Sequence, residues 1–185
     1  MVLRDPLLAL VSPVNLTWLT FALIYAGLIA GVIFLLRHPR ALLTTIESYV
    51  LLVLVRMVMM FFVPLDPPPG LIPLADPLVQ FVGSGGVPTR DLFFSGHAST
   101  LFLLSLTARG RLLKALFLCC AAAVAVAVLW QHVHYTIDVI VAPFAAYACY
   151  RLILLRDGRE DRLRVQGNAP ARLAAKPGIP HPPVQ

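Results

Sequence analysis

The sequence predicts an all-α integral membrane protein, a polytopic bundle of about five transmembrane helices. The chain of 185 residues is 59% hydrophobic and only 13% charged, with a mean hydropathy of +0.83. A soluble domain is about half apolar and about a quarter charged, so this class is excluded. The apolar residues also gather in runs that approach the ~20 residues a spanning helix needs. At this length we expect one domain.

Four apolar stretches are long enough, or nearly so, to span a bilayer: residues 15–36, 41–64, 112–130 and 136–155. A fifth, residues 93–108, is short. It is expected either to extend towards its Arg-Gly-Arg end or to begin recessed in the membrane. Residues 2–14 are expected to form an extra half-helix at the interface.

Two segments are not spans. Residues 65–91 contain six prolines, which exclude a regular spanning helix. The glycines around Ser84 predict a flexible loop rather than a phosphate-binding nest. Residues 157–185 are charged and then proline-rich, so a disordered cytoplasmic tail is predicted after a transmembrane catalytic domain of residues 1–156.

The basic residues predict the orientation. Alternating spans put 12 of the 15 on one side, and Lys and Arg favour cytoplasmic loops. The N-terminus is therefore expected outside and the C-terminus inside. The net charge of +6 is then a topology signal, and no nucleic-acid partner is predicted. The 12 residues are Arg37, Arg40, Arg109, Arg111, Lys114, Arg151, Arg156, Arg159, Arg162, Arg164, Arg172 and Lys176.

The first cluster with chemical potential is Arg90-Asp-Leu-Phe-Phe-Ser-Gly-His97. Ser95 is a natural N-cap for the helix that follows, which puts His97 in the first helical turn. Free backbone amides and the positive helix end suit a phosphate group there. A histidine at this point can protonate a leaving oxygen. The alternative is a polar cap with a solvated histidine.

The second cluster is His132-Val-His-Tyr-Thr-Ile-Asp138. On a helix His134 and Asp138 would share a face, so the carboxylate could orient the imidazole and stabilise its cation. The alternative is a structural hydrogen bond. His132 should point elsewhere and serve packing, although a metal role stays open.

The predicted topology brings both clusters to the outer face. Arg56 lies about 12 Å below the outer end of its span, so its guanidinium could reach a phosphate or Asp138. A structural ion pair is the alternative for Arg56. Glu47 is expected to have a structural role at the inner end. The three cysteines, which lack metal-binding spacing, are read as packing residues: Cys119, Cys120 and Cys149.

Asp91-Leu-Phe-Phe-Ser-Gly-His97 and His134-Tyr-Thr-Ile-Asp138-Val-Ile resemble the two catalytic motifs of the sphingomyelin synthase family. This family is a branch of the type 2 phosphatidic acid phosphatase superfamily. Both motifs occur in the family's order, on successive outward-facing segments. Arg56-Met-Val-Met-Met-Phe-Phe-Val-Pro64 is similar to the family's motif at the end of an earlier span. The resemblance covers residues 49–151.

The resemblance implies a helical bundle whose active site faces the lumen or periplasm. His134 would attack the phosphorus and form a phosphohistidine supported by Asp138, and His97 would protonate the departing oxygen. Neither a metal nor another cofactor is implied. The substrate-binding residues expected are Arg56, Arg90, Asp91, Ser95, Gly96 and Tyr135.

The sequence departs from these relatives in two respects. The family usually has six spans, so a sixth stays open beside the five found. The superfamily also carries a Lys and two Arg that hold the phosphate, and one of those positions is Val128 here. A phosphodiester carries less charge than a phosphomonoester and needs fewer cations, which favours a phospholipid headgroup.

The leading expectation is a phosphotransferase that moves phosphocholine or phosphoethanolamine from a glycerophospholipid to ceramide or diacylglycerol. The alternatives are a lipid phosphatase or phospholipase C-type hydrolase that uses water, and a non-catalytic lipid-binding membrane protein. The expected partners are the bilayer, a phospholipid donor and a lipid alcohol acceptor, and a homo-oligomer stays open. The short chain and brief loops are typical of a bacterial inner-membrane protein with a periplasmic active site.

Overall fold

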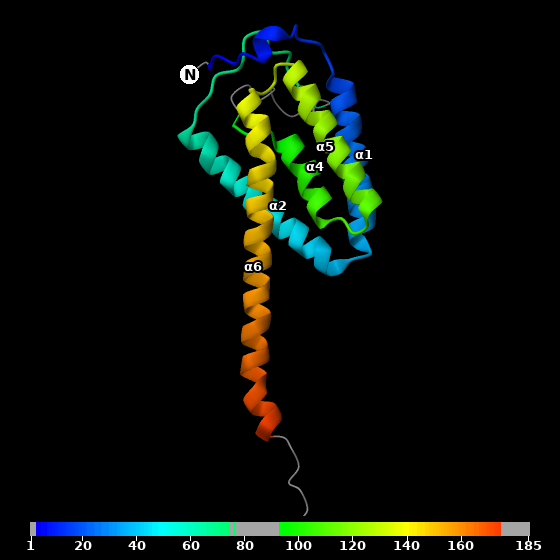
Figure 1. Ribbon diagram of the computed structural model, residues 1–185, viewed down its shortest axis with the longest axis vertical. Coiled ribbons are helices and arrows are strands. Elements are labelled where there is room, and N and C mark those ends of the chain that lie inside the picture. The colour runs from blue at the N-terminus through cyan, green and yellow to red at the C-terminus, as the bar shows by residue number, and fades with distance from the viewer. Residues whose placement is uncertain (1–2, 75, 77–92, 175–185) are drawn as a thin grey trace, which may run out of the picture.

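The computed structural model describes residues 3–74, 76 and 93–174, with side chains up to Arg159. These residues form helices and loops and contain no strand, as predicted (Figure 1). A short 3-10 helix, η1, precedes five α-helices. Their bounds are η1 Leu8–Leu10, α1 Thr17–Leu36, α2 Pro39–Phe62, α4 Gly96–Thr107, α5 Arg111–Trp130 and α6 Thr136–Ala174.

Four of these helices are long and apolar enough to cross a membrane: α1, α2, α5 and the part of α6 up to Arg159. The fifth, α4, has 12 residues. At about 1.5 Å per residue it is ~18 Å long, well short of the ~30 Å hydrocarbon core. Figure 1 shows α4 starting deeper in the bundle than the adjacent ends of α5 and α6. The short predicted span is therefore a recessed helix.

The short helix α4 is the centre of the bundle and contacts α1, α2, α5 and α6. Leu101 and Leu104 pack with α1 and α5, and Leu103 packs with α2 and α6. Two glycines of α1 make the first contact close. A Cβ on Gly27 would lie 2.5 Å from Leu101, and one on Gly31 would lie 3.0 Å from Leu104. Small residues commonly permit such close approach between membrane helices.

The N-terminal segment is a strap rather than the half-helix predicted for residues 2–14. Only Leu8–Leu10 are helical among its described residues. The Val14 amide donates to the Trp130 carbonyl at 3.0 Å, and the Leu16 amide donates to Gln131 Oε1 at 3.2 Å. These bonds tie the strap to the turn between α5 and α6, and so give the segment a fixed path without regular helix.

The last helix also differs from the expectation, because α6 continues to Ala174 where a disordered tail was predicted from Asp157. Residues 157–165 include three Arg, one Glu and one Leu, which are good helix formers, together with two Asp and one Gly, which are poorer ones. Before this extension, Arg156 forms an ion pair with Glu47 of α2. That contact gives Glu47 the structural role its position predicts. Residues 175–185 lie outside the described part of the chain.

Candidate active site

The N-terminus of α4 is joined to the first turn of α6. Ser95 is the N-cap of α4, because its Oγ accepts a hydrogen bond from the Ala98 amide at 3.4 Å. The Ser95 amide in turn donates to the Asp138 carbonyl at 3.3 Å. Phe94, with φ of 38°, turns the chain into the helix through the left-handed region, which is uncommon outside glycine. The two sequence motifs therefore meet.

Arg56 reaches this point from α2. A Cβ built on Gly96 would lie 2.7 Å from Arg56 Nη1, so the guanidinium lies directly over the first residue of α4. The first amides of a helix have no partner within the helix and carry partial positive charge. A guanidinium beside them creates a site suited to an anion such as phosphate.

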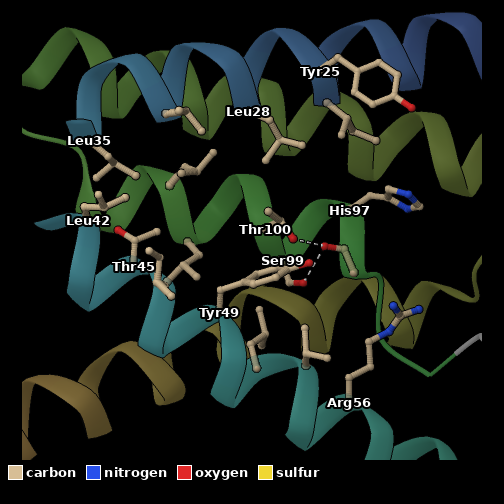
Figure 2. A pocket seen from close by; sticks show the side chains of 18 of the residues that line it. Tyr25, Leu28, Leu35, Leu42, Thr45, Tyr49, Arg56, His97, Ser99 and Thr100 are labelled. Carbon is tan, nitrogen blue, oxygen red and sulfur yellow. Dashed lines mark hydrogen bonds between the residues drawn. The ribbon is translucent and has the colours of Figure 1, made fainter. Parts of the chain in front are cut away.

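His97 follows in the first turn of α4 and is half-buried. Its ring stands edge-on to Phe21 of α1, with 5.9 Å between ring centres. His97, Gly96 and Arg56 line one end of a cavity of about 540 Å³ enclosed by α1, α2 and α4 (Figure 2). A phosphate at this end would meet a cation, a helix N-terminus and an imidazole.

The rest of this cavity is apolar. From Leu42 to Arg56 its α2 wall runs about 21 Å at ~1.5 Å per residue, and α1 supplies the opposite wall. The hydroxyl groups of its Ser and Thr residues are turned back to their own helices. Thr45 donates to the Ala41 carbonyl at 2.6 Å, and Thr100 donates to the Gly96 carbonyl at 2.7 Å. The cavity thus combines a charged end with a long apolar channel.

His134 and Asp138 lie close together, although not through the helical spacing predicted. His134 precedes α6, which begins at Thr136, and its Nδ1 lies 3.8 Å from Asp138 Oδ2. Asp138 Oδ2 also accepts the Tyr135 amide at 3.0 Å. Asp138 Oδ1 is buried and has no hydrogen-bond partner among the described residues. The carboxylate is thus placed to stabilise a charged imidazole.

The buried pair lies apart from the cavity wall. His134 is 3% exposed and Asp138 is fully buried, and neither lines the cavity described above. Arg56 and His97 do line it. A phosphate in the cavity therefore meets Arg56 and His97 directly, and reaches the His134 imidazole only after neighbouring groups move.

Two residues predicted to bind substrate contact the protein's own backbone instead. Ser95 is the buried N-cap of α4. The Tyr135 hydroxyl donates to the Asp66 carbonyl at 3.0 Å and accepts the Leu3 amide at 3.3 Å. Both are buried supports that lie outside the cavity wall. The predicted Arg90 and Asp91 fall outside the described residues.

His132 also has a structural role. Its Nδ1 lies 2.9 Å from the Pro69 carbonyl, and its Nε2 lies 3.1 Å from the Val11 carbonyl. Since carbonyls only accept, the ring donates a hydrogen bond to one of these carbonyls through the nitrogen that carries the proton. The residue has φ of 55° and clamps the N-terminal strap and the loop after α2 to one turn. These contacts favour packing over the metal role that the sequence left open.

Two cavity residues were missed by sequence reasoning. Asp76 and Tyr25 line its charged end, and the Tyr25 hydroxyl donates to Asp76 Oδ1. Tyr25 is a polar aromatic within an apolar span, and Asp76 is an acidic residue in a proline-rich loop. Each residue is therefore unusual for its segment, but no local sequence pattern links Tyr25 to Asp76.

Two comparisons with known proteins concern the family and the fold of this chain. Residues 90–154, which include both histidine motifs, match the family model described as PAP2 superfamily C-terminal. The crystal structure of Aquifex aeolicus LpxE is similar, with a TM-score of 0.57 and 18% identity over 82% of this chain and 87% of that one. No curated protein matches. Residues 90–154 are therefore similar to the C-terminal part of the PAP2 superfamily, and the chain of apolar helices has a fold like that of LpxE.

Proposed function

We propose that the protein is a membrane phosphotransferase that moves phosphocholine or phosphoethanolamine from a glycerophospholipid to ceramide or diacylglycerol. The cavity carries this proposal, because a phosphate-binding end opens directly into an apolar channel about 21 Å long. One leaflet contributes about half of the ~30 Å hydrocarbon core, so the channel is long enough for an acyl chain.

The small number of cations supports a diester donor. Arg56 is the only Arg or Lys among the described residues that line the cavity. A phosphomonoester is nearly a dianion and benefits from several cations, whereas a phosphodiester carries one negative charge. A phospholipid headgroup therefore suits this site better than a terminal phosphate.

In the first step, once the groups between the cavity and His134 have moved, His134 attacks the phosphorus through Nε2, since Nδ1 faces Asp138. The bond between phosphorus and the glycerol oxygen breaks. His97 gives its proton to that oxygen, and diacylglycerol leaves. Arg56 and the α4 amides stabilise the charge on the phosphoryl oxygens, and Asp138 stabilises the cationic phosphohistidine.

In the second step, a lipid alcohol enters the cavity and attacks the phosphorus. His97, now neutral, takes the hydroxyl proton, and the bond between phosphorus and His134 breaks. The headgroup leaves on the new lipid, and both histidines return to their starting states. A single cavity can serve donor and acceptor in turn, as a covalent intermediate permits.

A hydrolase is the second candidate. His97 is half-buried and lines the cavity, so a water molecule that enters the cavity could take the place of the lipid alcohol. Water would then replace the lipid alcohol in the second step, and the phosphorylated headgroup, or phosphate from a monoester, would be released. The residues and the first step are otherwise the same.

The test is transfer of label in vesicles that contain headgroup-labelled phosphatidylcholine or phosphatidylethanolamine, with and without fluorescent ceramide or diacylglycerol. Label on the acceptor lipid supports the transferase, and label released only to water supports the hydrolase. His134→Ala should abolish either signal, whereas His38→Ala, at the opposite end of the bundle, should retain it. Failure on these donors and on phosphatidic acid would contradict both enzymatic proposals.

A further inference from the structure

The charged end of the cavity contains an acidic side chain that phosphate binding does not require. Asp76 lines this end together with Arg56 and His97. A carboxylate repels phosphate at short range and so weakens binding of a simple anion. Its position is better explained if the ligand also carries a positive group.

Aromatic rings lie beside this carboxylate. Phe21 and Tyr25 stack on the same face of α1 with 5.8 Å between ring centres. Phe21 also meets the His97 ring, at 5.9 Å. The Tyr25 hydroxyl donates to Asp76 and holds the carboxylate at the end of this row of rings. Figure 2 shows Tyr25, His97 and Arg56 at the same end of the cavity.

We propose that Asp76, Tyr25 and Phe21 form a subsite for the cationic amine of a zwitterionic lipid headgroup. The inference deepens the proposed function and rests on it. Arg56 and the α4 N-terminus would hold the phosphate, and the carboxylate and aromatic rings would hold the ammonium group. Carboxylates and aromatic faces both attract ammonium ions. The two opposite charges of the headgroup are thus matched by two opposite charges of one cavity.

The subsite predicts a preference among diester lipids. We expect the protein to use phosphatidylethanolamine at higher kcat/KM than phosphatidylglycerol, which has no amine. Asp76→Asn should lower the ratio of kcat/KM on phosphatidylethanolamine to kcat/KM on phosphatidylglycerol at least about tenfold. A hydrogen bond to a charged group contributes enough free energy for a change of that size or more. Tyr25→Phe should lower the ratio less, because the ring stays. Glu47→Gln, which removes an acid at the other end of α2, should leave the ratio unchanged.

Two outcomes would overturn the subsite. Unchanged kcat/KM on both lipids in Asp76→Asn would mean that the carboxylate does not contact the headgroup amine. An equal loss of kcat/KM on both lipids, which leaves their ratio unchanged, would mean that Asp76 positions His97 or the loop rather than the ligand. If Asp76→Asn does not fold, as judged by thermal unfolding in detergent, Tyr25→Phe provides the same comparison.

A binding measurement separates this inference from the proposed function. In the His134→Ala background, calorimetry would compare phosphoethanolamine with ethyl phosphate, which differ only in the amine. Phosphoethanolamine should bind at least about tenfold more tightly, and Asp76→Asn should remove the difference. Equal affinities would contradict the subsite. If wild-type protein turns over no lipid, the proposed function fails, but this comparison still decides whether the amine subsite exists.

Discussion

Gly96 is the residue on which the phosphate-binding end depends most directly. The Arg56 guanidinium occupies the space that a side chain at this position would fill. Gly96 is the first residue of α4, so the same contact keeps the first amides of the helix next to the cation. Because Gly96 has no side chain, the Arg56 guanidinium of α2 and the N-terminus of α4 can contact the same ligand.

Replacing Gly96 with alanine should lower activity without lowering stability. The new Cβ would displace Arg56, and a shift of about 1 Å at a reacting centre can cost roughly a hundredfold in kcat/KM. Alanine is otherwise favoured over glycine in helices by up to ~1 kcal/mol, so the unfolding temperature should hold or rise. Gly158→Ala, where no atom lies within 4 Å, is the matched control and should keep wild-type turnover. Full activity in Gly96→Ala would show that the enzyme does not need the Arg56 guanidinium in the space next to Gly96.

His132 and His134 show why residue type alone does not determine a role. They are two positions apart in one turn, and both are buried. The two ring nitrogens of His132 face backbone carbonyls, whereas His134 directs Nδ1 at a carboxylate. Only the second arrangement leaves an imidazole next to an acid that can stabilise its charge.

At the scale of elements, the start of α6 is capped by a residue from the other end of the chain. The Thr136 amide donates to Asp5 Oδ2 at 2.7 Å, and the Thr136 hydroxyl donates to Asp5 Oδ1 at 3.0 Å. An acid is favourable at a helix N-terminus. Burial raises the pKa of Asp5, but hydrogen bonds from Thr136, Leu8 and Leu7 outweigh it, so the pKa of Asp5 is below its usual value.

This cap should make stability depend on pH. Because the pKa of Asp5 is lower in the folded than in the unfolded protein, the stabilisation is present above the ordinary value of 3.8 and is lost as pH falls through the folded pKa. In thermal unfolding from about pH 6 to about pH 3, the free energy of unfolding of the wild type should exceed that of Asp5→Asn by about 1 kcal/mol near pH 6. This difference should shrink towards pH 3. A difference that stays constant would exclude the Asp5 charge as its cause.

At the scale of the whole molecule, the two ends of the bundle differ in chemistry. Figure 1 shows the N-terminal strap and the turn between α5 and α6 at one end, with the turns after α1 and α4 and the α6 extension at the other. The second end carries most of the basic residues, including Arg37, Arg109 and Arg111. The bias of Lys and Arg towards the cytoplasm predicts that the strap and the site face outward.

Cysteine labelling in intact cells tests this orientation. An impermeant maleimide should react with Ser12→Cys, an exposed position in the strap, without permeabilisation. Arg109→Cys, exposed at the opposite end, should react only after the membrane is opened. The wild-type protein measures the background from its own three cysteines. The reverse pattern would place the site in the cytoplasm and contradict a periplasmic reaction.

Hydropathy along the chain predicted the class of the protein and most bounds of the five α-helices in its described part. Hydropathy, proline content and span length are properties of neighbouring residues, so they can be read along the chain. The motifs around His97 and His134 were visible for the same reason. Local reasoning was wrong where it extrapolated regular structure, as in assigning helical spacing to His134 and Asp138.

How these residues combine depends on the packing of whole helices. The helical walls of the cavity come from α1, α2 and α4, which are separate segments of the sequence. The contacts of Arg56 with Gly96, of Tyr25 with Asp76 and of Asp5 with Thr136 join residues that are dozens of positions apart. Helical periodicity relates residues only within about two turns of one another. Contacts of longer range follow from how whole helices pack, which the local sequence does not encode.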